Sequence, residues 1–247
     1  MQLLVVNPNT TASMTATIAS AATMAAASAT QIIAATSSMG PVSIEGYYDE
    51  AFALPGLLME IARQERAGVD AAVIACFDDT GLDAARAMAS IPVIGICEAA
   101  LATAGFIAKR FTVVTTMERS RVPIEELVHR YGMVGRAKVR AANISVLSLE
   151  DPNSGARDRL RNEIVKAIEQ DNAEAIVLGC AGMADLAKTL QREFGMPVID
   201  GVGAAVKQAE ALVALGLSTS KRGSYASPVV KPYTGAMRDF APQLLTA

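Results

Sequence analysis

The feature that most restricts the fold of this chain is an internal repeat with a period of a little over 100 residues. Three apolar segments recur in the same order in the second half: Val5–Asn7 is matched by Val113–Thr115, Ile74–Cys76 by Leu178–Cys180, and Ile91–Ile94 by Met196–Ile199. One matching triplet is common, but three collinear ones at nearly constant spacing predict two similar halves. The 247 residues suffice for two small domains. We expect an N-terminal lobe of residues 1–100 plus about 205–247, and a C-terminal lobe of residues 101–204.

Each half alternates short apolar runs with helical stretches. Helical patterns follow the first apolar run to about Ala29 and extend from about Glu50 to Arg66. Alternating strands and helices, with strands that are apolar throughout, are typical of parallel βαβ units. The predicted fold class is therefore α/β, with two pseudo-symmetric lobes, each a mainly parallel sheet flanked by helices. The expected strands are Leu3–Val6, Gln31–Thr36, Ala71–Ala75, Val93–Ile96, Phe111–Thr115, Val139–Leu147, Ala175–Leu178 and Val198–Ile199.

Composition excludes several classes of function. With 22 Lys and Arg against 25 Asp and Glu, the chain has no surplus of cations for binding nucleic acid. A single histidine, His129, cannot supply a multi-histidine metal site, and we expect neither a metal nor a cofactor. No charged residue precedes Glu45, but polar residues interrupt this segment and the first basic residue is Arg63, so we expect neither a membrane span nor a signal peptide. The expected location is the cytoplasm, with free thiols.

Two of the three cysteines stand at equivalent places in the repeat. Cys76 and Cys180 each follow an apolar strand and precede a turn and a helix, and ligands of open α/β sheets bind beyond such strand ends. If the lobes face each other, both thiols reach one cleft, where the dipole of the following helix favours the thiolate. Burial as a small apolar side chain is the alternative for each. Cys97 has Val202 as its counterpart, so we assign it to packing.

Several short motifs together resemble one family of enzymes. The motifs are Asn7-Pro8-Asn9-Thr10-Thr11, Gly40-Pro41 with Ser43-Ile44-Glu45-Gly46, Ala75-Cys76-Phe77-Asp78-Asp79, Thr115-Thr116-Met117 and Leu178-Gly179-Cys180-Ala181-Gly182-Met183. As a set, over residues 2 to about 220, they resemble the hydantoin racemase and allantoin racemase branch of the Asp/Glu racemase superfamily. The resemblance implies a cofactor-independent racemase with an active site in the cleft between two pseudo-symmetric lobes, and one catalytic cysteine from each lobe.

The chemistry of racemisation suits two cysteines. Inverting a carbon that bears an acidic hydrogen requires proton removal on one face and delivery on the other, so two acid/base groups must flank the carbon. A thiolate and a thiol meet this need, and their apparent pKa values belong to the pair. We therefore predict that Cys76 and Cys180 act on C5 of a 5-substituted hydantoin, with allantoin, another five-membered cyclic ureide, as the closest alternative. The motifs do not separate a 5-substituted hydantoin from allantoin.

Ten further residues are predicted to bind the substrate. The backbone N–H groups after each cysteine, which we expect at helix starts, are candidate donors to the developing enolate oxygen. The Asn and Thr residues after the first strand of each half are expected at the polar edges of the ring, with capping or turn formation as the alternative. The resemblance places the Ser-Ile-Glu segment near the substrate, with a solvated loop charge as the alternative for its Glu. The ten are Asn9, Thr10, Ser43, Ile44, Glu45, Phe77, Thr115, Thr116, Ala181 and Gly182.

Other conspicuous residues receive structural roles. Asp78 and Asp79 are expected to stabilise the start of the next helix, although orienting a base or binding a metal is the alternative. We expect His129 to pack or to lie on the surface of a helix. Gly201-Val202-Gly203 lacks the third glycine of a dinucleotide-binding loop and is a weak signal.

Three other functions fit the fold less well. Racemisation of aspartate or glutamate calls for a cationic clamp, which the strand-end motifs lack. Decarboxylation in the manner of arylmalonate decarboxylase, which keeps one of the two cysteines, is disfavoured by the presence of Cys76. A small-molecule binding protein would not need two equivalent thiols. The expected partners are a small cyclic ureide and further copies of this chain, and the tail after about Leu217 ends in a short amphipathic piece, Met237 to Leu245, that packs on the body or on a neighbour.

Overall fold

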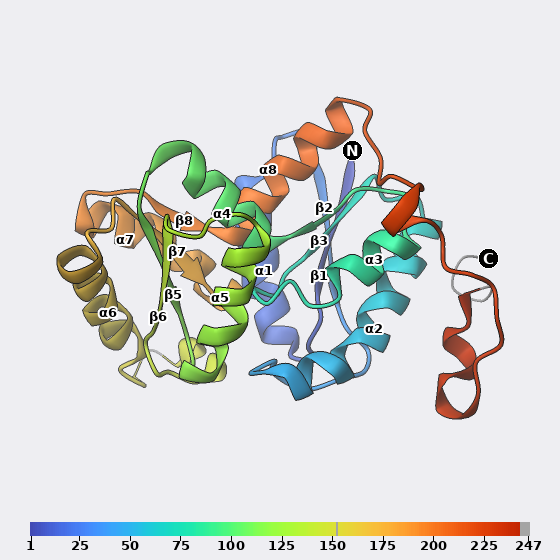
Figure 1. The fold of residues 1–247 in the computed structure, drawn as a ribbon, viewed down its shortest axis with the longest axis horizontal. Helices are drawn as coiled ribbons and strands as arrows, with labels where there is room; N and C mark the ends of the chain where they lie inside the picture. The colour runs from blue at the N-terminus through green and yellow to red at the C-terminus, as the bar shows by residue number, and fades with distance from the viewer. Residues whose placement is uncertain (152, 243–247) are drawn as a thin grey trace.

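The computed structural model describes residues 1–151 and 153–242, which form two four-stranded parallel sheets with the same strand order (Figure 1). The first sheet has the order β2-β1-β3-β4, with β1 (Gln2–Asn7), β2 (Gln31–Thr36), β3 (Ala71–Ile74) and β4 (Val93–Gly95). The second has the order β6-β5-β7-β8, with β5 (Phe111–Thr115), β6 (Ala137–Ala141), β7 (Ala175–Gly179) and β8 (Val198–Asp200). The repeat in the sequence is thus a repeat of the fold, and the predicted α/β class is confirmed.

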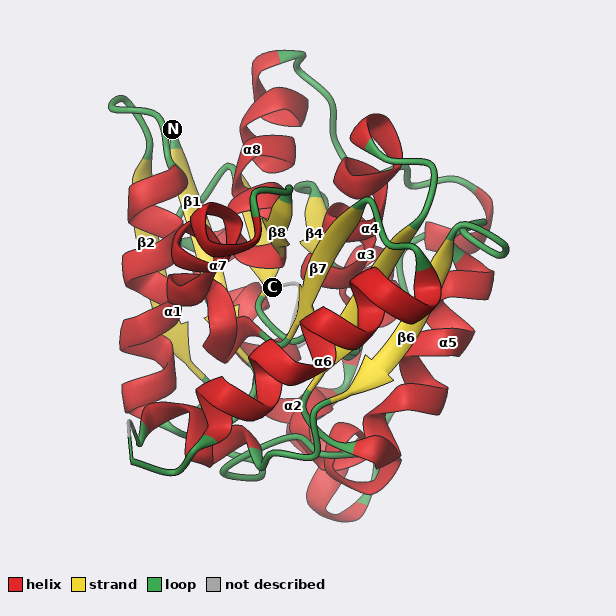
Figure 2. Ribbon diagram, turned by 90° about the vertical axis from the view of Figure 1, so that its left-hand side faces the viewer, coloured by secondary structure: helices red, strands yellow, loops and turns green. Residues whose placement is uncertain are grey.

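Helices cover the sheets and fill the space between them (Figure 2). Two of them, α4 and α8, contact strands of both sheets, because α4 packs on β4 and β7 while α8 packs on β3 and β7. No helix in the described part of the chain is long and apolar enough to cross a membrane. The helices are α1 (Ala12–Ala25), α2 (Tyr47–Arg66), α3 (Leu82–Met88), α4 (Ile96–Ile107), α5 (Arg121–Arg130), α6 (Ala156–Asp171), α7 (Ala187–Phe194) and α8 (Gly201–Ala214).

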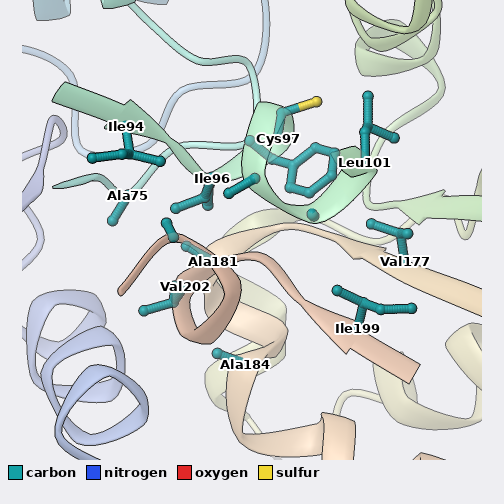
Figure 3. Close-up of a cluster of buried hydrophobic side chains, with 14 of the residues drawn as sticks. Ala75, Ile94, Ile96, Cys97, Leu101, Val177, Ala181, Ala184, Ile199 and Val202 are labelled. Carbon is teal, nitrogen blue, oxygen red and sulfur yellow. The ribbon is translucent and has the colours of Figure 1, made fainter. Parts of the chain in front are cut away.

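One hydrophobic core joins the two sheets (Figure 3). Val73 of β3 and Val177 of β7 are fully buried in it, together with Leu101 of α4 and Val202 of α8. Smaller clusters cover the outer face of each sheet. Cys97 is fully buried in the shared core, in agreement with its assignment to packing. Because the core is shared, the two lobes hold the strand ends of both sheets in a fixed relation.

The chain returns to the first lobe after α8. The Thr219 hydroxyl donates to the Ile91 carbonyl oxygen, and the Lys221 ammonium donates to the Arg86 and Ala87 carbonyl oxygens at the end of α3. The lobe boundaries at residues 100/101 and 204/205 stay predictions, and they fall inside α4 and α8. The predicted amphipathic piece begins within a short 3-10 helix, Gly235–Phe240, and its residues 243–245 lie outside the described residues.

Two predicted elements extend several residues too far, while the strands predicted at Ala71–Ala75 and Val93–Ile96 each overrun by one residue. The strand expected at Val139–Leu147 ends at Ala141, because its partner β5 ends at Thr115, and residues Val146–Glu150 form a 3-10 helix, η2. The left-handed backbone of Asn143, with φ 52°, redirects the chain between them. The first helix ends at Ala25 rather than about Ala29, and beyond it the Ala27 N–H donates to the Glu210 carboxylate of α8.

Candidate active site

The carboxyl ends of the two sheets open onto one cleft. It contains about 430 Å³ of empty space, partly open to solvent, and both Cys76 and Cys180 line it. Cys76 follows β3 and Cys180 follows β7, the strands that hold the same position in the two sheets. The described residues contain no group of three side chains arranged to bind a metal ion. Of the predicted site residues, those in the lining are Asn9, Ile44, Cys76, Phe77, Thr115, Thr116, Cys180 and Ala181.

Four predicted residues lie beside the lining rather than in it. The Thr10 N–H and hydroxyl both donate to the Pro41 carbonyl oxygen, which fastens the loop before α2 to the end of β1. Ser43 is partly buried in that loop. Glu45 accepts a hydrogen bond from the Val146 N–H at 3.2 Å and so joins the two lobes at the edge of the cleft. The Gly182 N–H is directed at the Cys180 sulfur and favours its ionised form.

The polar strand ends serve the fold and still face the cleft. The Asn9 side-chain oxygen accepts from the Asn7 amide at 2.8 Å and from the Thr11 N–H at 3.0 Å, so Asn9 shapes the turn before α1. Among the described residues, its own amide group has only the weak Met14 sulfur acceptor, at 3.5 Å. The Thr115 hydroxyl donates to the Gly179 carbonyl oxygen at 3.0 Å and ties β5 to β7. Turn formation and ligand contact are therefore compatible here.

Both thiols are only partly exposed where they line the cleft, and the protein packed around them governs their ionisation. Burial raises the pKa of Cys180 to about 11 and, more strongly, that of Cys76, because a thiolate in either place loses hydration. The nearby Asp78 carboxylate raises the pKa of both thiols further. Backbone N–H groups after each cysteine do favour the thiolate, but burial outweighs them at both places, so neither pKa is lowered overall. After Cys76 the chain forms a turn and α3 begins only at Leu82, so Phe77 is not at a helix start.

Asp79 stabilises a different helix from the one predicted. Its buried carboxylate accepts hydrogen bonds from the N–H groups of Cys97 and Glu98 at 2.9 Å each, at the start of α4, and from the Tyr131 hydroxyl at 2.7 Å. Since Tyr131 follows α5 in the second half of the chain, this carboxylate joins the Cys76 turn to both lobes. Gly95 leaves the space that the carboxylate fills, because a Cβ there would collide with it.

Asp78 is a cleft residue and not a helix cap. It lines the same cavity as the two thiols, and burial together with the charges of Glu50 and Asp79 raises its pKa to about 7. We read Asp78 and Asp79 together as helix-start acids from the sequence, and the structure separates their roles. His129 is exposed near the end of α5, in agreement with a surface position.

Three lining residues, Met14, Ser120 and Val146, lie outside every motif that the sequence suggested. Met14 belongs to the buried face of α1, and no local motif distinguishes it from other core methionines. Ser120 and Val146 lie in short 3-10 segments after β5 and β6, where Val146 was expected inside a strand. The available signal was their position just beyond strand ends, since such segments border the ligand in this class of fold.

Comparison with known proteins places this arrangement in context. A model of the family described as Asp/Glu/hydantoin racemase matches residues 3–209. A hydantoin racemase from Pseudomonas sp. (strain NS671) is 50% identical over 242 residues, or 97% of each chain. One from Rhizobium meliloti is 50% identical over 236 residues, or 95% of this chain and 98% of the relative. The solved structure of an allantoin racemase from Klebsiella pneumoniae has a TM-score of 0.95 at 46% identity and covers 98% of this chain and 99% of its own.

Proposed function

The chain belongs to the Asp/Glu/hydantoin racemase family and is a racemase, and we propose that it inverts C5 of 5-substituted hydantoins, with Cys76 and Cys180 as the two acid/base groups. One observation carries the proposal: two thiols from equivalent strand ends line a single cleft. Cys97, the third cysteine of the chain, does not line that cleft. Two protein groups of the same type on facing strand ends are what a reaction that runs equally in both directions needs.

The proposed reaction is a proton transfer through an enolate. One cysteine thiolate takes the C5 hydrogen as a proton, the C–H electron pair moves into the adjacent ring carbonyl, and the other thiol delivers a proton to the opposite face. The thiolate and thiol have then exchanged roles, and no other reactant is consumed. The high pKa of the buried thiols makes the thiolate a strong base, as a weak carbon acid demands. The Phe77 and Ala181 N–H groups are the proposed donors to the enolate oxygen.

The lining of the cleft favours an apolar 5-substituent. Met14, Ile44 and Val146 contribute apolar side chains to the lining, and burying an alkyl or aromatic substituent against such side chains is favourable. No lysine or arginine is among the described residues that line the cleft, which disfavours a free amino-acid carboxylate as the substrate. The relatives named hydantoin racemase support the same choice.

Allantoin is the second candidate, by the same two-cysteine mechanism. The solved relative named allantoin racemase supports it, and so do the polar groups that share the lining. The Asn9 amide, bonded only weakly to Met14, and the hydroxyls of Thr116 and Ser120 are the proposed partners of the additional ureido group of allantoin.

The test follows the C5 hydrogen of single enantiomers in D₂O by NMR, together with optical rotation. We expect racemisation with incorporation of solvent deuterium at C5, and the faster of an alkyl-substituted hydantoin and allantoin identifies the substrate. Cys97→Ala is the matched control, because it removes a thiol outside the cleft and should leave the rate unchanged. Absence of exchange with both substrates, from folded and reduced protein, would contradict the proposal.

A further inference from the structure

Asp78 lies where two cavities meet. On one side it lines the cleft that holds both cysteines. On the other it lines a second cavity, with about 680 Å³ of empty space partly open to solvent, between α2, α5 and the turn before α3. We call this second cavity the acidic chamber, after the ionisable groups that line it: Tyr47, Glu50, Asp79, Asp83, Glu126 and Arg130.

The carboxylate of Asp78 has no compensating partner. The described residues give it neither a hydrogen bond nor an ion pair, and the groups that act on it most, burial aside, are the negative charges of Glu50 and Asp79. One oxygen of Glu50 is itself buried without a hydrogen-bond partner in the described structure. Arg130, the basic side chain of the chamber, pairs with Asp83 instead, at 3.5 Å. Asp78 is thus an unusually strong proton acceptor for a carboxylate.

Apart from Glu50, the other acidic groups nearby already accept hydrogen bonds or form an ion pair. Asp79 accepts three hydrogen bonds, from Tyr131 and the start of α4, and Glu126 accepts one from the Tyr47 hydroxyl at 3.0 Å. Glu45 accepts from the Val146 N–H. Among the described residues that line the cleft of the two thiols, Asp78 is the one carboxylate. It also raises the pKa of both, so the protonation of Asp78 and of the cysteines is coupled.

The buried Thr80 hydroxyl would stabilise a negative charge on the Cys76 sulfur. Among the described residues, the Thr80 hydroxyl is buried and makes no hydrogen bond, but it lies close enough to the Cys76 sulfur to lower the pKa of that thiol. The Asp78 N–H acts on the same sulfur in the same sense. These donors are satisfied when Cys76 is a thiolate, which means that the turn is built for the ionised form although burial opposes it.

We propose that Asp78 accepts the thiol proton that creates the catalytic thiolate and exchanges it with solvent through the acidic chamber. The proposal rests on the two-cysteine function stated above. In the step, the S–H bond of a cysteine breaks and an O–H bond forms on the Asp78 carboxylate, so that the negative charge moves from oxygen to sulfur and nothing leaves the site. One thiolate, one thiol and a neutral Asp78 remain, which is the state that racemisation requires.

The proposal fixes the pH dependence of activity. The two thiols and Asp78 must together have lost one proton, and the first proton to leave comes from Asp78, whose pKa is raised to about 7. Activity therefore rises with pH through an apparent pKa near neutrality that belongs to the three groups together. Replacing Asp78 by Asn removes the acceptor, so that the rising limb moves up toward the ionisation of a buried thiol.

The experiment compares pH profiles of kcat/KM for C5 deuterium exchange, from about pH 5.5 to about pH 10. We expect Asp78→Asn to move the rising limb upward by more than about one pH unit, and Asp78→Glu to bring it back toward neutrality. Glu50→Gln should move the limb downward, because Glu50 raises the pKa of Asp78. Asp158→Asn is the control, since this exposed carboxylate pairs with Arg161 outside both cavities and its loss should leave the limb in place.

The outcomes distinguish a failure of the proposed role of Asp78 from a failure of the proposed two-cysteine function. If the parent enzyme racemises and Asp78→Asn keeps its limb near neutrality, the role of Asp78 is overturned and the two-cysteine function stands. If Asp78→Asn is folded by circular dichroism but inactive throughout, Glu50→Gln decides: a downward shift supports the relay, and an unmoved limb overturns it. If the parent shows no C5 exchange, or keeps it after Cys76 and Cys180 are both replaced by Ser, the proposed function itself fails.

Discussion

The two lobes share a strand order but cap their central helices in different ways. At the end of β8, Asp200 is the N-cap of α8, and its own side chain accepts from the Val202 and Gly203 N–H groups. At the end of β4, the equivalent N-cap of α4 is Gly95, which has no side chain, and the carboxylate comes from Asp79 in the Cys76 turn. The same helix-capping need is met locally in one lobe and from the active-site turn in the other.

This difference makes the two cysteines chemically unequal. The Cys76 turn is held by Asp79 to α4 and to Tyr131 of the other lobe, and it carries Asp78 into the cleft. The chain after Cys180 instead continues directly into a 3-10 helix, Ala181–Leu186, whose Gly182 N–H favours the thiolate. A duplicated backbone therefore supplies two strand-end thiols with different surroundings, as suits the proposed mechanism, in which one thiol serves as the base while the other serves as the acid.

The largest expected effect comes from removing either thiol. Cys76→Ser and Cys180→Ser should each lower the rate of racemisation about 10²–10⁴-fold, because each removes one of two acid/base groups. Each variant keeps the group on one face of the substrate, so it should exchange the C5 hydrogen of one enantiomer only. The two variants should select opposite enantiomers, which NMR in D₂O with each pure enantiomer measures directly.

Alkylation provides the control for these variants. In a Cys97→Ala background, a thiol reagent reads the ionisation of the single remaining cleft cysteine as a function of pH. The onset should come at lower pH when Cys180 remains than when Cys76 remains, because the pKa of Cys76 is raised more strongly. Equal onsets, or exchange of both enantiomers by either variant, would show that the lobes are not specialised in this way.

The second effect tests the two helix caps. Asp79→Ala should cost about 2–4 kcal/mol of unfolding free energy, because it leaves two α4 N–H groups and the Tyr131 hydroxyl unpaired in a buried place. Asp200→Ala removes a local cap and should cost about 1 kcal/mol. Chemical denaturation of both variants against the parent gives the comparison, and a larger loss for Asp200→Ala would contradict it.

The pH dependence of the Asp79 effect has a definite sign. Burial raises the pKa of Asp79 to about 6, so the folded state binds this proton more tightly than the unfolded chain does. The stability that Asp79 contributes is therefore fully present below its ordinary pKa and declines as pH rises through about 6. The gap between the parent and Asp79→Ala should widen when denaturation is measured at about pH 5 instead of about pH 7.5.

The features that the two lobes share were predictable from the sequence, whereas the features that differ between the lobes were not. The collinear motifs identified both sheets and both strand-end cysteines, because buried parallel strands are apolar runs whose ends border the ligand. The distinct roles of Asp78 and Asp79 were not predictable, since they depend on α4, Tyr131 and Glu50, which are distant in the chain. The raised pKa of Cys76 was missed for the same reason, because burial is a property of the packed cleft and not of a motif.

The smallest expected effects concern two hydrogen bonds between the lobes, one buried, from Tyr131 to Asp79, and one exposed, from Tyr47 to Glu126. Tyr131→Phe removes a hydrogen bond to the buried Asp79 carboxylate and should cost about 1.5–3 kcal/mol. Tyr47→Phe removes the matching contact at the surface, to Glu126 at 3.0 Å, and should leave the melting temperature unchanged, because water replaces an exposed partner. Thermal unfolding of the two variants measures both, and their kcat/KM at neutral pH shows which link holds the cleft. Tyr131 binds Asp79, and Asp79 holds the turn that carries Cys76. We therefore expect Tyr131→Phe to lower kcat/KM and Tyr47→Phe to preserve it. A loss confined to Tyr47→Phe would mean that the surface contact, and not the buried carboxylate, sets the relation of the two thiols.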